Sequence, residues 1–404
     1  MSDDARTGRL PELVLNRREE RRLRAGHLWV FSNEVNTEQS PLKGFATGDE
    51  VTVMTHGGTP LGSAYVNPHA LICARIYNRR PNVRLDEARI AHRLADALAL
   101  REAYYPTPHY RLCFGEADGL PGLIVDRYGD VLVAQLTTAG MEARRAAVID
   151  ALDGLLSPTA ILLRNDTGSR ALEGLEQGVE TVLGTLPEQL QIDEGGVQFA
   201  VPATGGQKTG WFYDQHANRD AFIRHVAGKR VLDLFSYVGA WGIRAAVAGA
   251  DSVVCVDSSA PALEALAANA EANGVGGIVA TGRGDVFEAL RSLRDDGERF
   301  DVVVVDPPAL IKRRKDHRAG LEAYRRLNRL AINVLEPGGL LVSASCSYHL
   351  SRDDLRGAME RAAIQSGAEL QIIEQGHPGP DHPIHPAIPE TDYLKSFTAR
   401  MLQA

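Results

Sequence analysis

The chain is poor in cysteine and has no long hydrophobic run. Its four cysteines, Cys73, Cys113, Cys255 and Cys346, lie far apart without a C-x-x-C pair, which excludes the usual zinc spacings and argues against a disulfide framework. The first three sit in or beside strand-like runs and are expected to be buried. No apolar stretch approaches a membrane span, and the residues after Met1 are polar. We therefore expect no signal peptide, no transmembrane helix, no membrane partner and a cytoplasmic location.

A complete dinucleotide fingerprint is also missing. The turn within residues 231–242 follows a β-branched apolar run and precedes an alanine-rich helical pattern, as in a nucleotide-binding βαβ unit. However, Tyr237 stands where the first glycine of G-x-G-x-x-G belongs, and only Gly239 and Gly242 fit. This departure disfavours a nicotinamide dehydrogenase.

Length and charge set wide bounds. A chain of 404 residues with 44% hydrophobic and 24% charged residues is typical of a globular protein of two or three domains. The formal net charge of -8 argues against a surface that is basic all over, but nucleic-acid binding needs only a local basic patch. Global charge therefore does not decide the partner.

What the C-terminal half does have is an acid at the end of each of four strand-like segments. These acids are Asp233, Asp257, Asp285 and Asp306. Because the carboxyl ends of parallel strands meet at one edge of a sheet, we expect the four carboxylates on one rim. Such a rim repels pyrophosphate and suits a cation, although an Asp before a helix is also a good N-cap.

In order and spacing, these residues resemble the class I S-adenosylmethionine-dependent methyltransferases, through Asp233, Gly239, Asp257, Asp285 and the Asp306-Pro-Pro turn. The resemblance implies an α/β, Rossmann-like domain over residues 201–404 with S-adenosylmethionine as its cofactor. The cationic sulfonium of this cofactor, which carries no phosphate, fits the acidic rim. The implied cofactor contacts at the turn and the strand ends are Asp233, Phe235, Ser236, Gly239, Asp257, Asp285 and Asp306.

The stretch 207–219 stands just before the first strand of that domain. In the same family, the corresponding stretch folds over the cofactor. The matching residues here are Lys208, Thr209, Gly210, Phe212, Asp214, Gln215 and Arg219, and all but Gly210 are expected to contact it. His216 departs from the more usual Arg. The alternative is a linker capped by Asp214, which would have to pack several charged side chains without a ligand.

Residues 1–78 read as a small β-barrel. Short strand-like runs separated by turn residues occur at 12–15, 28–31, 50–54, 61–66 and 71–77. The first connection is basic, with Arg21, Arg22 and Arg24 leading to Trp29; it could follow a phosphate backbone, or be a solvated helix face paired with nearby glutamates. The pattern resembles the opening of a PUA domain, an RNA-binding β-barrel, which implies RNA contacts from these four residues.

Residues 79–200 are expected to form a small α+β middle domain. Residues 83–104 keep apolar side chains at helical spacing, and strand-like runs and a second helical pattern follow between residues 110 and 164. The segment 115–126 resembles the middle domain of bacterial 23S rRNA large-subunit methyltransferases that carry a PUA domain. Its glycines are better explained by turns than by catalysis.

Cys346 differs from the other cysteines. The run 338–345 reads as a turn and a buried strand, which places Cys346 at the strand's carboxyl end, on the same rim as Asp306. The sequence Ser345-Cys346-Ser347 resembles the RNA 5-methylcytosine methyltransferases, whose nucleophile is the Cys of a Ser/Thr-Cys-Ser motif. DNA cytosine methyltransferases use a Pro-Cys after the fourth strand, where this chain has Asp306-Pro-Pro-Ala without a cysteine.

The chemistry implied for Cys346 is covalent. Attack of its sulfur on C6 of cytosine moves electron density to C5, which takes the methyl group, and loss of the C5 proton releases the enzyme. Asp306 would hold or share a proton at N3 or N4. The site must also favour the thiolate, but the sequence does not name the group that does so.

Three histidines near the C-terminus do not predict a metal site. His377, His382 and His385 are interrupted by prolines at irregular spacing, and we expect them to be loop residues with no bound metal.

Together these resemblances imply methylation of C5 of a cytosine in 23S rRNA. The expected partner is 23S rRNA or a precursor of the large ribosomal subunit. The sequence does not decide whether the chain forms a homodimer. Two alternatives remain. Asp306-Pro-Pro also resembles the turn of amino-methyltransferases, which indicates methylation of a purine nitrogen. A non-catalytic RNA-binding assembly factor would retain the fold without taking up the cofactor.

Overall fold

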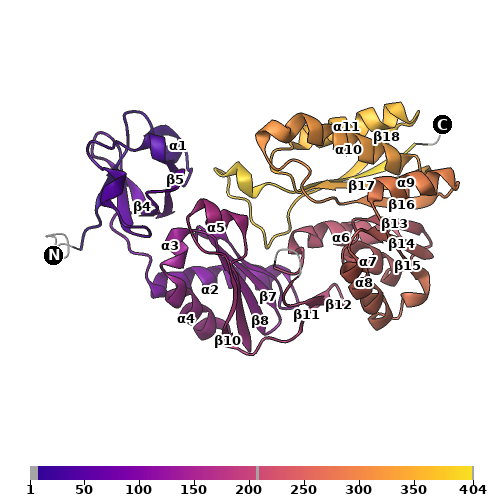
Figure 1. Ribbon diagram of the computed structural model, residues 1–404, viewed down its shortest axis with the longest axis horizontal. Coiled ribbons are helices and arrows are strands. Elements are labelled where there is room, and N and C mark those ends of the chain that lie inside the picture. Colours follow the sequence, from indigo (N-terminus) through magenta and orange to yellow (C-terminus); the bar gives the residue numbers. More distant parts are fainter. Residues whose placement is uncertain (1–7, 206–208, 403–404) are drawn as a thin grey trace. The chain divides into compact units, whose positions relative to one another are not determined.

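The computed structural model describes residues 8–205 and 209–402. Contacts within the chain divide it into two compact units (Figure 1). The first consists of residues 1–190, 202–211 and 380–391, and the second of residues 191–201, 212–379 and 392–404. Among the described residues, none of the helices combines the length and the apolar character of a membrane span. The predicted three-domain boundaries stay a prediction.

The N-terminal part of the first unit is a five-stranded sheet in the order β1-β3-β4-β5-β2. Its elements are β1 (Glu12–Val14), α1 (Glu20–Arg24), β2 (Trp29–Phe31), β3 (Glu50–Met54), β4 (Pro60–Val66) and β5 (Ile72–Asn78). Strand β1 pairs in parallel with β3, and the other pairs are antiparallel. Fully buried side chains such as Val30, Val51 and Ile76 fill its core. The strands lie within two residues of their predicted positions.

The middle part of the first unit is a second five-stranded sheet, in the order β10-β9-β8-β7-β6. Its elements are α2 (Glu87–Tyr104), β6 (His109–Phe114), β7 (Leu123–Tyr128), β8 (Val131–Leu136), α3 (Ala139–Glu142), α4 (Arg145–Leu156), β9 (Ala160–Arg164), α5 (Gly168–Leu172) and β10 (Val179–Gly184). Helix α2 begins later than the pattern predicted because the side chain of Asp86 caps it, accepting from the amide of Arg89 at 3.0 Å. A hairpin of β11 (Gln189–Glu194) and β12 (Val197–Pro202) follows.

The second unit is built on a seven-stranded sheet in the order β15-β14-β13-β16-β17-β19-β18. Its strands are β13 (Arg230–Leu234), β14 (Ser252–Asp257), β15 (Val279–Arg283), β16 (Phe300–Val305), β17 (Leu335–Ser345), β18 (Leu370–Gly376) and β19 (Lys395–Met401). Strands β13 to β17 run parallel, and β19 is antiparallel to both of its neighbours. The strand order reverses between β13 and β16, and ligands of open sheets bind at the carboxyl ends beside such a point.

Helices cover both faces of this sheet. They are α6 (His216–Phe222), α7 (Ala240–Val247), α8 (Ala260–Ala272), α9 (Val286–Asp295), α10 (His317–Ile332) and α11 (Arg352–Gln365). Helices α9, α10 and α11 share one core with strand side chains, while α7 and α8 pack against β13, β14 and β15 (Figure 1). Because both faces are covered, β16 reads as a continuous run of buried valines, Val302 to Val305.

Candidate functional site

The turn between β13 and α7 has a constrained backbone. Phe235, Tyr237 and Gly239 all have positive φ, at 62°, 50° and 90°. A Cβ atom on Gly239 would lie 2.7 Å from side-chain atoms of both Ile243 and Leu266, so a larger residue does not fit. Left-handed backbone at non-glycine residues is costly and gathers at functional sites. The constrained backbone therefore marks the turn between β13 and α7 as part of a candidate functional site.

Asp233, the fourth residue of β13, lies beneath this turn and is fully buried. Its Oδ2 accepts a hydrogen bond from the amide of Gly242 at 2.9 Å, and its Oδ1 has no hydrogen-bond partner among the described residues. Burial raises the pKa of Asp233 to about 8. The hydroxyl of Ser236 is likewise buried without a partner in the described part of the chain. Because buried polar atoms are normally hydrogen-bonded, these two atoms are candidates to contact a bound polar group.

Asp257 ends β14, and its carboxylate accepts hydrogen bonds from the backbone of two different turns. Its Oδ2 accepts from the amide of Tyr237 at 3.0 Å, and its Oδ1 accepts from the amide of Ser259 at 2.8 Å. A carboxylate has about four acceptor positions, so further donors can still bind this half-buried group. Asp285 is different, because it is exposed and caps α9 by accepting from the amide of Glu288 at 3.1 Å. Its cofactor contact stays a prediction.

Asp306 follows β16 and is held by two donors. The amide nitrogen Nε2 of Gln215 donates to Oδ1, and the indole Nε1 of Trp241 donates to Oδ2, each at 3.0 Å. Burial raises the pKa of Asp306 to about 6, against the lowering effect of the hydrogen bond from Trp241. Gln215 was a predicted site residue. Trp241 was not, although its place in the turn motif was the signal that could have identified it.

The remaining predicted residues of the 212–219 segment are anchored within the second unit. The ring of Phe212 meets that of Tyr237 edge to face, with centroids 5.7 Å apart. Asp214 accepts from the hydroxyl of Tyr393 at 2.6 Å. Arg219 forms a two-fold pair with Glu194, at 2.5 and 2.6 Å, in which both side chains are 1% exposed.

Glu194 was not predicted as part of the site. It lies on β11, outside any motif, and also accepts from Arg244 at 2.9 Å. Burial alone would raise the pKa of Glu194, but the charges and hydrogen bonds of the arginines lower it to about 2. The ion pair with Glu194 holds Arg219 in place, and Arg219 in turn supports the 212–219 segment.

Two residues at the start of the 207–219 stretch, Lys208 and Thr209, were also predicted to contact the cofactor. Lys208 lies outside the described residues. Thr209 belongs to the first unit, where it is 1% exposed. Its hydroxyl donates to the carboxylate of Asp126, and its carbonyl accepts from the hydroxyl of Tyr128 at 3.0 Å. Their contacts with a cofactor stay predictions.

Cys346 follows β17 and is partly exposed, whereas the other three cysteines are buried, as predicted. The strand end around it is fixed by the hydroxyl of Tyr324, which accepts from Ser345 Oγ at 2.7 Å and lies 3.0 Å from Ser347 Oγ. Ser347 Oγ also accepts from the amide of Ile311 at 3.2 Å, in the loop after Asp306. Since β16 and β17 are parallel neighbours, Asp306 and Cys346 leave the sheet at the same edge.

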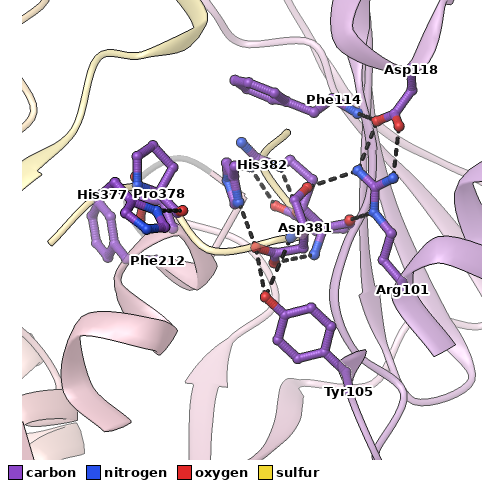
Figure 2. Close-up of polar contacts among 12 residues, drawn as sticks. Arg101, Tyr105, Phe114, Asp118, Phe212, His377, Pro378, Asp381 and His382 are labelled. Atoms are coloured by element: carbon purple, nitrogen blue, oxygen red, sulfur yellow. Dashed lines mark hydrogen bonds and ion pairs between the residues drawn. The ribbon is translucent and has the colours of Figure 1, made fainter. Parts of the chain in front are cut away.

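The C-terminal loop of the first unit holds Asp381 in a set of hydrogen bonds. Its carboxylate accepts from the amide of Arg111 at 3.0 Å and from the hydroxyl of Tyr105 at 3.1 Å, and it pairs with His382 at 2.9 Å (Figure 2). Its carbonyl accepts from Arg101 at 2.8 Å. No group of three or more His, Cys, Asp or Glu side chains in the described ranges is arranged to hold a metal. His377, His382 and His385 lie in loops.

The predicted RNA-binding residues of the first unit divide into two pairs. Arg21 and Arg24 are exposed on α1. Arg22 instead pairs with Glu34 at 2.8 Å, and the indole of Trp29 donates to Glu116 at 2.7 Å. An RNA role for all four stays a prediction.

Comparisons with known proteins agree with this geometry. Residues 13–79 match the model of a PUA-like domain, and residues 175–392 match that of an S-adenosylmethionine-dependent methyltransferase. Ribosomal RNA large subunit methyltransferase I of Klebsiella pneumoniae subsp. pneumoniae is 38% identical over 400 residues, covering 97% of this chain and 98% of that protein. The protein of the same name from Escherichia coli O139:H28 is 38% identical over 396 residues, covering 96% and 99%.

Solved structures support the fold. SMU.776, a methyltransferase complexed with SAH, aligns with a TM-score of 0.83 at 21% identity, over 97% of this chain and 100% of that one. A sam-dependent methyltransferase from Streptococcus mutans aligns with a TM-score of 0.81 at 21% identity, over the same shares. The predicted α/β methyltransferase fold, the PUA-like domain and the cofactor S-adenosylmethionine are confirmed. The chain belongs to the ribosomal RNA large subunit methyltransferase I family of S-adenosylmethionine-dependent methyltransferases.

Proposed function

We propose that this chain methylates C5 of one cytosine in 23S rRNA, or in a precursor of the large ribosomal subunit, in the cytoplasm. The names of its relatives support large-subunit rRNA as the substrate class, and the PUA-like domain supports RNA binding. The observation that carries the choice of carbon is the placement of Cys346. It is the partly exposed one of the four cysteines, and it follows β17, the neighbour of the strand that ends before Asp306.

The second unit's own residues fit the cofactor. Asp233 Oδ1 and Ser236 Oγ are buried polar atoms without partners among the described groups, and Asp257 keeps acceptor positions suited to ribose hydroxyls. The carboxylate of Asp257 favours a cationic ligand over a phosphate. We therefore assign Asp233, Phe235, Ser236, Gly239 and Asp257 to the cofactor site, together with the predicted contacts Lys208, Thr209, Phe212, Asp214, Gln215, Arg219, Asp285 and Asp306.

S-adenosylmethionine, when bound, supplies an electrophilic methyl group. C5 of cytosine is too weak a nucleophile to accept it unaided. The thiolate of Cys346 would form a bond to C6 and move the electrons of the C5–C6 double bond toward C5, which would take the methyl group as S-adenosylhomocysteine leaves. Transfer of the C5 proton to a base returns the electrons to the ring, breaks the bond between sulfur and C6, and frees Cys346.

Asp306 is suited to manage the charge that builds up on the ring. With a pKa near 6, its carboxyl group can gain or share a proton close to neutral pH. Gln215 and Trp241 each occupy one of its oxygens and fix its orientation. A proton shared with N3 or N4 of cytosine would neutralise the charge that develops as sulfur adds.

RNA binding is assigned to the first unit. Arg21 and Arg24 are exposed cations that can contact phosphates, while Arg22 and Trp29 would have to exchange their contacts with Glu34 and Glu116. The target base must leave its stack to meet both cofactor and thiol. Binding of the surrounding RNA by the PUA-like domain offsets part of that cost.

Two other functions predict different outcomes. Methylation of a purine nitrogen is the alternative implied by the resemblance of the Asp306-Pro-Pro turn to that of amino-methyltransferases, and it would make Cys346 dispensable. A non-catalytic assembly factor would bind RNA but not S-adenosylmethionine.

Mass mapping of rRNA tests the proposal. A strain lacking the gene should miss one methyl group on one 23S rRNA cytosine, and the wild-type gene should restore it. A gene carrying Cys346→Ala should not restore it. A methyl group missing from a purine instead would overturn the proposal and favour the nitrogen reaction.

A further inference from the structure

Lys395 is a buried ammonium at the start of β19. It is 5% exposed and stands opposite Ser345 in the antiparallel pairing of β17 with β19. Ser345 is the residue before Cys346. Burying a charged side chain is costly unless it is paired or serves a function.

The ammonium is held by carbonyl groups. Its Nζ donates to the carbonyl of Ser347 at 2.8 Å and to that of Tyr393 at 2.7 Å. Within the described ranges, no carboxylate lies at ion-pair distance from Lys395. An ammonium has three donors, so these two bonds leave one more. The charge is therefore fixed beside the Cys346 segment without being neutralised by an acid.

Several charges face this ammonium. Asp392 precedes β19, Arg352 and Asp354 lie at the start of α11, and Cys346 follows β17. Burial lowers the pKa of Lys395 to about 8, while Asp392 and the ionised Cys346 act to raise it. The Tyr324 hydroxyl also faces Cys346, but burial raises its pKa, so it is neutral at working pH.

We propose that Lys395 is a positioning residue whose buried ammonium, fixed on the carbonyl of Ser347, holds the Cys346 thiol in its ionised form. The inference rests on the proposed role of Cys346 as nucleophile. Only the thiolate adds to C6, and a nearby cation lowers the pKa of a thiol. The charge on Lys395 persists until the pH rises through its own pKa. The stabilisation of the Cys346 thiolate by Lys395 is thus present at neutral pH and weakens above about pH 8.

The test is the rate at which iodoacetamide alkylates Cys346 in the full-length protein, followed against pH. The modified residue is located by peptide mass spectrometry, and the burial of the other three cysteines keeps the signal specific. Lys395→Met should raise the pH midpoint by about one unit or more and slow alkylation at pH 7 roughly tenfold. Lys395→Arg, which keeps the charge, should stay close to wild type. Lys229→Met, before the start of β13, is the matched control and should change nothing.

A purely structural role would not move this midpoint. If Lys395→Met binds S-adenosylmethionine normally and keeps the wild-type midpoint, the inference is wrong. If Lys395→Met does not fold, Lys395→Gln replaces it with the same expected shift. A wild-type midpoint at or above that of free cysteine, about 8.5, would overturn the inference without any variant.

A second measurement separates this inference from the proposed function. RNA carrying 5-fluorocytosine at the target should form a covalent adduct with the wild-type protein. A shifted midpoint in Lys395→Met without any wild-type adduct would leave the electrostatic pairing intact and remove the C5 reaction. A wild-type adduct together with an unshifted midpoint in Lys395→Met would support the C5 reaction and remove the electrostatic role of Lys395.

Discussion

The indole Nε1 of Trp241 donates to Oδ2 of Asp306 at 3.0 Å, so an aromatic side chain of α7 reports on the carboxyl group after β16. Burial raises the pKa of this carboxyl to about 6. The fluorescence of Trp241, taken as the difference between wild type and Trp241→Phe, should therefore change with a midpoint near pH 6. Asp306→Asn should abolish the midpoint. A change that persists in Asp306→Asn would assign the titration to another group.

Asp257→Ala should weaken cofactor binding while the fold persists. Loss of a charge-assisted hydrogen bond to ribose costs on the order of 1.5–3 kcal/mol, which lowers affinity roughly tenfold to more than a hundredfold. Calorimetry with S-adenosylmethionine measures the effect. Asp251→Ala, an exposed residue before the start of the same strand, is the control. Equal affinity in the Asp257 variant and the control would remove Asp257 from the site.

The buried pair of Glu194 and Arg219 predicts a stability change with a definite sign. The folded-state pKa of Glu194, about 2, lies below its ordinary value of 4.5, so its stabilisation is present above pH 4.5 and is lost as the pH falls toward 2. Glu194→Gln should lower the free energy of unfolding at pH 7 by roughly 3 kcal/mol. Denaturant titration checks this, with the exposed Glu264→Gln as control. A variant as stable as the control would show that the pair contributes nothing net.

The exposed arginines of α1 give a prediction about RNA. Replacing both Arg21 and Arg24 by Ala should weaken rRNA binding and reduce the slope of log affinity against log salt by roughly 1.5 to 2. The paired change of Arg356 and Arg361 to Ala on α11 is the control for lost positive charge. An unchanged salt slope would assign RNA binding to other residues.

Removing residues 1–78 altogether should preserve cofactor binding but sharply reduce methylation of long rRNA.

Sequence patterns predicted the strand ends and the turn after β13 well. The strand-end acids and the turn at Gly239 follow from short-range rules, because strand, turn and helix alternate within a few residues. The carboxyl ends of parallel strands must then share an edge. The structure places Asp233, Asp257, Asp306 and Cys346 at or next to the ends of neighbouring strands of one sheet.

The partners of those residues could not be predicted, because they come from distant parts of the chain. Glu194 lies on a hairpin that no motif marked, yet it fixes Arg219. Lys395 begins β19, a strand that the pattern missed because Lys, Thr and Arg interrupt its apolar run. Its approach to Cys346 depends on the antiparallel register of β17 with β19, which only tertiary structure specifies.

Covalent trapping at Cys346 tests the central claim most directly. Fluorine cannot leave C5 as the proton does, so elimination stalls after methyl transfer and the bond between sulfur and C6 persists. Target RNA carrying 5-fluorocytosine, incubated with S-adenosylmethionine, should give wild-type protein an RNA adduct whose mass maps to Cys346. Cys346→Ala should give no adduct and no methylation, with cofactor affinity nearly unchanged. A Cys346→Ala protein that still methylates the RNA at an appreciable rate would contradict the account.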